Sequence, residues 1–156
     1  MVDSFGRKIN YLRISVTDRC NLRCIYCMPP EGVKLIDHGK ILTYDQIADF
    51  TRVAVSKGID KVRITGGEPL VRKNIATLVK MLSSIQGIKD LSMTTNGILL
   101  EEFAHQLKEA GLMRVNVSLD TMDPAKYKEV TRGGDIFAVL RGLAAAMAAG
   151  LGPVKI

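Results

Sequence analysis

Three cysteines lie close together in the chain, at Cys20, Cys24 and Cys27, and the chain contains no others. Thiolates bind zinc and iron, and three of them can hold three of the four irons of a 4Fe-4S cube. A structural zinc site or a saturated cube needs a fourth protein ligand. One iron would therefore have no protein ligand. Such an iron can bind a small molecule and pass it an electron. The spacing predicts a metal centre that performs chemistry.

Two other interpretations of these cysteines stay open at this point. The thiolates could form a zinc site completed by His38 or by a partner, because Cys-x-x-Cys pairs often bind zinc. They could also be ordinary reactive or buried cysteines. A zinc module would bind the metal stoichiometrically and show no absorption in the visible region.

The composition indicates one soluble domain or a piece of one, with 156 residues, 47% of them hydrophobic and 24% charged. No apolar run is long enough to cross a membrane, and no signal peptide is visible. We therefore expect a cytoplasmic, reducing compartment that keeps the thiols available. The net charge of +6 suits an anionic partner. Nucleic acid is not expected, because the basic residues form no dense run and aromatic residues are few.

Apolar strand-like runs alternate with helical patterns, which predicts an α/β fold with a parallel sheet. The expected strands cover residues 11–16, 61–65, 90–94, 114–119 and 153–156. The expected helices cover residues 43–57, 74–84, 100–110 and 136–149. Thr43 and Gln46 have the spacing of a capping box, and Gly58, Gly111 and Gly150 stand where helices end.

Alternate residues of the expected strands divide into an apolar face and a polar face. In the first strand, Leu12 and Ile14 share one face while Arg13 lies on the other. By the same phase the polar face collects Arg13, Ser15, Arg63, Thr65, Ser92, Thr94, Asn116, Ser118, Asp120 and Lys155. A parallel sheet with helices on both faces would be apolar on both. The polar face therefore predicts a wet, concave interior that could hold a substrate.

The segment Thr65-Gly66-Gly67-Glu68-Pro69 directly follows the second expected strand. Parallel α/β folds bind ligands at this end of their strands. The two glycines would let the backbone approach a ligand closely, and Glu68 would accept from an ammonium group. Pro69 would stiffen the exit of the turn.

These motifs together resemble a known family. The matching segments are Phe5-Gly-Arg7, Tyr11 to Cys20, the cysteine loop through Met28-Pro29, Arg63 to Leu70, Thr94-Thr-Asn-Gly97, Asn116 to Asp120 and Val154-Lys-Ile156. The cysteine spacing and Gly-Gly-Glu-Pro resemble radical S-adenosylmethionine (SAM) enzymes in general. The arginines of the first two strands and the Thr-Thr-Asn-Gly turn resemble the GTP 3′,8-cyclases of molybdenum cofactor biosynthesis, which are lyases. The resemblance extends over essentially the whole chain.

The resemblance implies a 4Fe-4S cluster, bound SAM and GTP as substrate. The residues that match family positions are Cys20, Cys24 and Cys27 for the cluster, Tyr26, Gly67, Glu68 and Ser118 for SAM, and Arg13, Arg63, Thr94 and Lys155 for GTP. In this family an electron from the reduced cluster cleaves SAM, and the resulting 5′-deoxyadenosyl radical removes the ribose 3′ hydrogen of GTP. The protein orients the reactants and excludes water and oxygen.

The resemblance also implies a fold, the N-terminal portion of a partial (β/α)6-type parallel barrel. Residues 1–156 would be an incomplete radical SAM core domain, because the family continues into a C-terminal domain with a second cluster bound by three later cysteines. We expect a truncated product that does not cyclise GTP by itself. The expected partners are a reductase or flavodoxin-type electron donor and a second copy in a homodimer of the full-length form.

Two further alternatives remain beside the zinc module. A radical SAM enzyme acting on a peptide would share the cysteine loop and Gly-Gly-Glu-Pro but would have no need of Arg13 and Arg63. A non-catalytic basic module would bind RNA or DNA with steep salt dependence and would need no iron.

Overall fold

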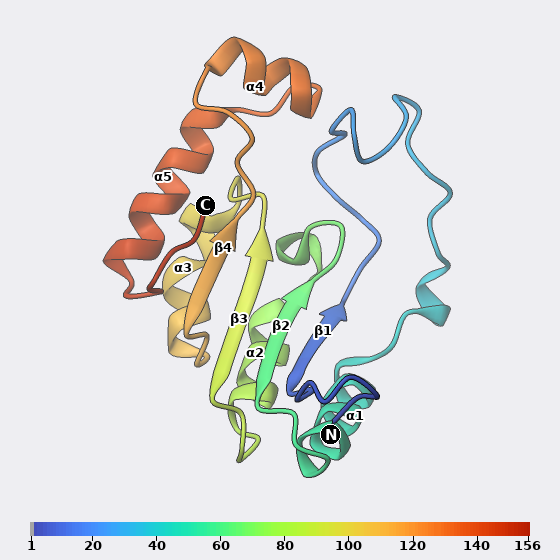
Figure 1. Ribbon diagram of the computed structural model, residues 1–156. Helices are drawn as coiled ribbons and strands as arrows, with labels where there is room; N and C mark the ends of the chain where they lie inside the picture. Colours follow the sequence, from blue (N-terminus) through green and yellow to red (C-terminus); the bar gives the residue numbers. More distant parts are fainter. Residues whose placement is uncertain (1) are drawn as a thin grey trace.

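Four parallel strands in the order β1-β2-β3-β4 form the centre of the computed structural model, which describes residues 2–156 (Figure 1). They are β1 (Tyr11–Ser15), β2 (Lys61–Thr65), β3 (Asp90–Thr95) and β4 (Arg114–Val117). The spatial order equals the chain order, as successive strand-helix units require. The expected α/β architecture with a parallel sheet is therefore confirmed.

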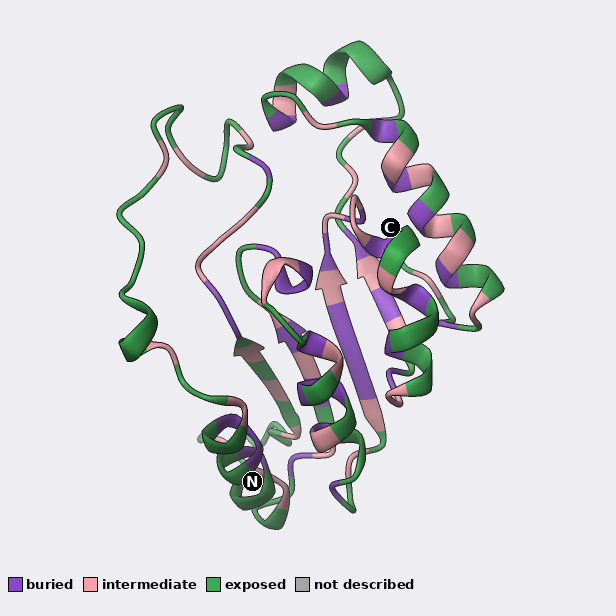
Figure 2. Ribbon diagram, turned by 180° about the vertical axis from the view of Figure 1, so that it is seen from behind, coloured by how far each residue is buried: buried purple, intermediate pink, exposed green. Residues whose placement is uncertain are grey.

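The helices between the strands pack on one face of the sheet and leave the other face without a helix (Figures 1 and 2). The elements are η1 (His38–Lys40), α1 (Tyr44–Ser56), η2 (Pro69–Val71), α2 (Ile75–Ser83), α3 (Leu100–Glu109), α4 (Pro124–Thr131) and α5 (Ile136–Ala148). Helix α5 packs beside α3, and α4 lies beyond the carboxyl ends of the strands. Within residues 2–156, no helix is long and apolar enough to span a membrane.

The core lies between the sheet and its helices. Six helix-facing residues of β2, β3 and β4 are at most 3% exposed, whereas Leu12 and Ile14 of β1 are partly buried; the six are Val62, Ile64, Leu91, Met93, Val115 and Val117. Burying one such side chain contributes about 1.5–3 kcal/mol. This layer explains why the helices cover the apolar face and why the polar face stays open.

The predicted helix boundaries hold at both ends. The Thr43 hydroxyl accepts from the Gln46 amide at 3.2 Å, and the Thr43 amide donates to the Gln46 side chain at 2.9 Å. This is the capping box expected from the sequence. Gly58, Gly111 and Gly150 follow three helices with positive φ angles of 100°, 99° and 75°.

The structure differs from the prediction at the end of the chain and after β4. The expected strand at 153–156 is reduced to one parallel bridge between Lys155 and Asn116 of β4. Helix α4 was not predicted. Its signal was present in the sequence, because Asp123 caps the amides of Ala125 and Lys126 and a proline follows it.

Candidate active site

The open face of the sheet carries a row of polar side chains at one level. Arg13 of β1 lies opposite Arg63 of β2, Arg63 lies opposite Ser92, and Ser92 lies opposite Arg114. One level closer to the carboxyl ends, Thr94 and Lys155 lie opposite Asn116. The structure thus places the four residues predicted to contact GTP on a single face that no helix covers.

Two arginines of this row have no carboxylate partner among residues 2–156. Arg114 donates to both oxygens of Asp90, at 2.9 and 2.6 Å, and this pairing raises the pKa of Arg114. Arg63 donates only to the Ser92 hydroxyl, at 3.4 Å, and its guanidinium lies 5.3 Å from the centre of the Tyr11 ring. Within the described residues, neither Arg13 nor Arg63 forms an ion pair. Their charges therefore remain available to an anion.

The cysteine loop leaves β1 and rests on the turn after β2. The Gly67 amide donates to the Thr17 carbonyl at 2.7 Å, and the Glu68 amide donates to the Arg19 carbonyl at 2.8 Å. A Cβ atom on Gly67 would lie 2.3 Å from the Arg19 carbonyl oxygen, and one on Gly66 would lie 2.6 Å from that of Thr17. The sequence predicted close approach to a ligand. The structure shows that the glycines permit close approach to the backbone that leads into the cysteines, and their approach to a ligand stays a prediction.

The Glu68 carboxylate is fully buried and binds groups of the chain itself. It accepts from the Leu70 amide at 3.0 Å, the Thr95 hydroxyl at 2.8 Å and the Asn96 amide at 2.7 Å. Burial raises its pKa, and these three hydrogen bonds partly offset the effect. Glu68 thereby ties the end of β2 to the end of β3. A contact between this carboxylate and SAM stays a prediction.

The three thiols differ in their surroundings. The Cys20 sulfur accepts from the Leu22 amide at 3.4 Å and lies 3.8 Å from the Asn96 side-chain nitrogen, whereas Cys27 is exposed. Burial raises the pKa of Cys20 and of Cys24. Cys20 also lines a cavity of about 310 Å³ inside the loop. Loading a metal here would require the loss of thiol protons.

Within residues 2–156, no group of three or more His, Cys, Asp or Glu side chains is arranged to hold one metal ion. A cube does not need such convergence, because each thiolate binds a different iron. His38 lines a separate cavity of about 480 Å³, together with Arg19 and Tyr44. The structure does not bring His38 into the cavity that Cys20 lines.

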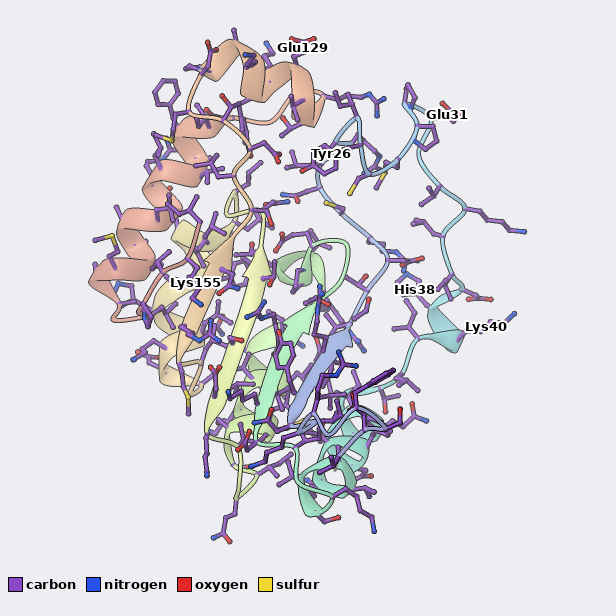
Figure 3. All side chains as sticks on the ribbon, in the orientation of Figure 1. Tyr26, Glu31, His38, Lys40, Glu129 and Lys155 are labelled. Atoms are coloured by element: carbon purple, nitrogen blue, oxygen red, sulfur yellow. The ribbon has the colours of Figure 1, made fainter. Side chains whose placement is uncertain are left out.

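Tyr26 joins the cysteine loop to the end of β4. Its hydroxyl donates to Asp120 at 2.8 Å, and burial and the Asp120 carboxylate both raise its pKa. Ser118 lies at the same strand end, where its amide donates to the Thr95 carbonyl at 2.9 Å. Figure 3 shows Tyr26 beyond the carboxyl ends of the strands, and Lys155 beside the sheet. Of the residues predicted to contact SAM, Tyr26 belongs to the cysteine loop, Gly67 and Glu68 contact the base of that loop, and Ser118 lies two residues before the Asp120 that Tyr26 contacts.

A buried hydroxyl supports the presence of a further group in this region. Tyr127 is fully buried, and its hydroxyl has no hydrogen-bond partner among residues 2–156. Buried polar atoms without partners are rare in folded proteins. Burial and then the Cys24 thiol raise the pKa of Tyr127 to about 12. A donor set of three thiols and an orphaned hydroxyl fits an iron-sulfur cluster, whose sulfur atoms accept hydrogen bonds.

Sequence reasoning gave no site role to four residues that support the site. Asn96 bonds to Asn21 at 2.7 Å beside the Cys20 sulfur, and Asp120 holds Tyr26. Tyr127 lies in the helix that was not predicted, and Arg132 caps the C-terminus of that helix. Asn96 and Asp120 stand in matched motifs, so strand-end position could have found them, whereas nothing local indicates the other two.

The geometry agrees with the comparison to known families. Residues 14–156 match the model of the radical SAM superfamily, and the chain belongs to that superfamily. It is 56% identical over 156 residues to the GTP 3′,8-cyclase of Alkaliphilus oremlandii and 57% identical to that of Moorella thermoacetica, with all of this chain covered. The chain spans 49% and 48% of those two proteins, about half the length of the relatives it matches.

Solved structures share the fold at lower sequence identity. SuiB of Streptococcus suis bound to its precursor peptide SuiA has a TM-score of 0.74 at 21% identity, covering 91% of this chain and 31% of SuiB. Methylornithine synthase (PylB) has a TM-score of 0.74 at 17% identity, covering 96% of this chain and 44% of that enzyme. These likenesses establish the radical SAM fold and say nothing of the substrate.

Proposed function

We propose that this chain is the radical SAM portion of a GTP 3′,8-cyclase of molybdenum cofactor biosynthesis. The observation that carries the proposal is the pair Arg13 and Arg63, which face the open side of the sheet and form no ion pair with a carboxylate of residues 2–156. Guanidinium groups bind phosphate oxygens through forked hydrogen bonds. The triphosphate of GTP is such an anion. The identity to cyclases over the whole chain supports the same substrate.

The roles of the other residues follow from their places. Cys20, Cys24 and Cys27 would hold the 4Fe-4S cluster, which when bound would supply the electron for reductive cleavage of SAM. Tyr26, Gly67 and Ser118 would contact SAM beside the loop. Thr94 and Lys155 would add a hydroxyl and a positive charge to the GTP site. These groups orient the two ligands on the polar face.

We further propose a division of labour along the full-length enzyme. Residues 1–156 would supply radical generation and triphosphate binding, and a C-terminal domain with a second cluster would recognise guanine. This portion alone would then bind SAM without completing cyclisation. A cytoplasmic location, a reductase or flavodoxin-type electron donor and a homodimeric full-length form belong to the same proposal.

The substrate test uses the full-length protein, reconstituted without oxygen with iron and sulfide. Arg13→Gln and Arg63→Gln should each weaken GTP binding about tenfold or more in calorimetry, since a hydrogen bond to a charged group contributes about 1.5–3 kcal/mol. Arg141→Gln, at an exposed arginine of α5 paired with Glu101, is the matched control and should bind normally. Unchanged GTP binding in both variants would favour a radical SAM enzyme acting on a peptide.

The cofactor test is electron paramagnetic resonance of the reduced protein with and without SAM. A reduced 4Fe-4S signal that changes shape on addition of SAM is the expected result. Tight zinc binding without a cluster would favour the zinc module instead. Salt-dependent binding of RNA or DNA in an iron-free protein would favour the basic module.

A further inference from the structure

The C-terminal end of α4, which is distant in sequence, is hydrogen-bonded to the cysteine loop. The Ile25 amide donates to the Val130 carbonyl at 2.9 Å, and the Arg23 amide donates to the Thr131 carbonyl at 3.3 Å. A helix leaves its last carbonyls without partners inside the helix. Here the two amides that flank Cys24 donate hydrogen bonds to two of these carbonyls.

The side chain of Arg132 completes this contact. Its Nη1 atom donates to the Arg23 carbonyl at 2.8 Å and to the Met28 carbonyl at 2.7 Å. These two carbonyls bracket Cys24 and Cys27. Within residues 2–156, Arg132 forms no ion pair, so its charge is not neutralised by a carboxylate.

The backbone of Arg132 is unusual for its residue type. Its φ of 53° and ψ of 54° lie in the left-handed region, where asparagine and glycine are favoured over arginine. The other described non-glycine residue with positive φ is Asn74, which tolerates this conformation. A residue held in a costly conformation indicates that its side chain does something that a glycine could not.

We propose that Arg132 is a positioning residue that holds Cys24 and Cys27 in place for the cluster and sets its reduction potential through its positive charge. The proposal rests on the proposed function, since it requires a cluster at the three cysteines. The cluster gains negative charge on reduction, so a nearby guanidinium favours the reduced form. Removing the guanidinium would therefore both loosen the loop and lower the reduction potential.

Three substitutions in the full-length protein separate this role from simple helix capping. Arg132→Gln removes the charge, Arg132→Lys keeps it, and Arg132→Gly removes the side chain while relieving the left-handed strain. Lys128→Gln is the matched control, because Lys128 is an exposed cation of the same helix whose side chain makes no described contact. If Arg132 served only to cap the helix, glycine would suit the position better than arginine. If its side chain anchors the cysteine loop, glycine would remove that anchor.

The first readout needs no cluster. In the metal-free protein, alkylation of Cys24, which is partly buried in the wild type, should be several-fold faster in Arg132→Gln and Arg132→Gly than in the wild type. Deuterium uptake by the peptide that contains Ile25 should rise in the same variants. Wild-type values in both variants would overturn the proposal, and this holds even if the wild type proves unable to bind a cluster.

The second readout is the reconstituted cluster. Iron per chain should fall in the glutamine and glycine variants, and the potential of any cluster that forms should become more negative. Lysine should restore both, and Lys128→Gln should match the wild type. The glycine variant should still fold, because glycine adopts the left-handed conformation without strain. A glutamine variant with full iron content and an unchanged potential would contradict the proposal.

Discussion

Arg13 lies directly opposite Arg63 in the parallel register of β1 and β2, and neither has a carboxylate partner in the described chain. Like charges placed opposite each other in a sheet destabilise it by about 0.2–1 kcal/mol. The pair therefore lowers the stability of the ligand-free protein, and an anion bound between the two side chains would remove that penalty. Stability and ligand affinity should respond in opposite directions when one charge is removed.

Arg13→Gln tests this opposition. The free energy of unfolding of the ligand-free protein should rise by up to about 1 kcal/mol, because the repulsion is gone. The nucleotide should also stabilise the variant less than the wild type, since stabilisation follows affinity. Chemical denaturation with and without GTP measures both. A variant that is less stable and still binds GTP normally would contradict the assignment.

Gly67→Ala should damage the base of the cysteine loop. The added methyl group would meet the Arg19 carbonyl at 2.3 Å, which is closer than atoms can pack. Overpacking of this kind costs about 1–3 kcal/mol. We expect a lower melting temperature and less iron per chain after reconstitution. Gly39→Ala is the control, because a Cβ there meets nothing within 4 Å.

Glu68→Gln should destabilise the junction between β2 and β3. One carboxylate oxygen would become the NH2 of a side-chain amide, a donor that faces a backbone N–H, which leaves a buried donor without an acceptor. The expected loss is about 1–3 kcal/mol in the free energy of unfolding. Denaturation with urea measures it. A loss below a few tenths of a kcal/mol would mean that the carboxylate does not tie the strands together.

The same variant makes a prediction about pH. The pKa of Glu68 is raised by burial in the folded protein, so the folded state binds the proton more tightly than the unfolded state. Its contribution to stability is fully present below the unfolded pKa of about 4.3 and is lost as the pH rises through the folded pKa. The difference in stability between wild type and Glu68→Gln should therefore shrink from pH 4 upward. A difference that grows with pH would show that the folded pKa is lowered instead.

Tyr26→Phe should affect the site more than the fold. The lost hydrogen bond to Asp120 joins two exposed groups, so the cost in stability should be about 0.5 kcal/mol, at the low end for a hydrogen bond. The change that SAM causes in the paramagnetic resonance spectrum should be reduced. Tyr44→Phe removes a hydroxyl that donates to the Lys73 carbonyl at 2.8 Å, and it should leave the spectrum unchanged.

The polar face could be predicted because strand residues alternate with a period of two. Arg13 and Arg63 needed only the correct strand assignment to fall on the same side. Helix α4 begins at Pro124 after the capping residue Asp123. That signal was present in the sequence, but the segment is short and polar, so no helix was predicted there. The expected last strand failed because a single bridge at Lys155 is all that forms beside β4.

The parts of the site that escaped prediction depend on contacts between distant residues. Glu68 has the motif position of a ligand-binding carboxylate, and its sequence context does not reveal that three buried donors surround it. Arg132 contacts the carbonyl of Arg23, which lies 109 positions earlier in the chain. No local pattern encodes a contact of that range. Only the folded arrangement of α4 against the loop reveals it.

The anchoring of the cysteine loop also sets an order of events during synthesis. The loop appears early from the ribosome, but its supports come later: the Gly67 turn, Asn96, Asp120 and finally Arg132. Domains emerge and fold from the N-terminus onward. Until residue 132 has left the ribosomal tunnel, the three thiols lie on an incompletely anchored segment. Iron and sulfide that arrive before that moment would find the cysteines without a formed site. We therefore expect the cluster to assemble only after α4 has been translated.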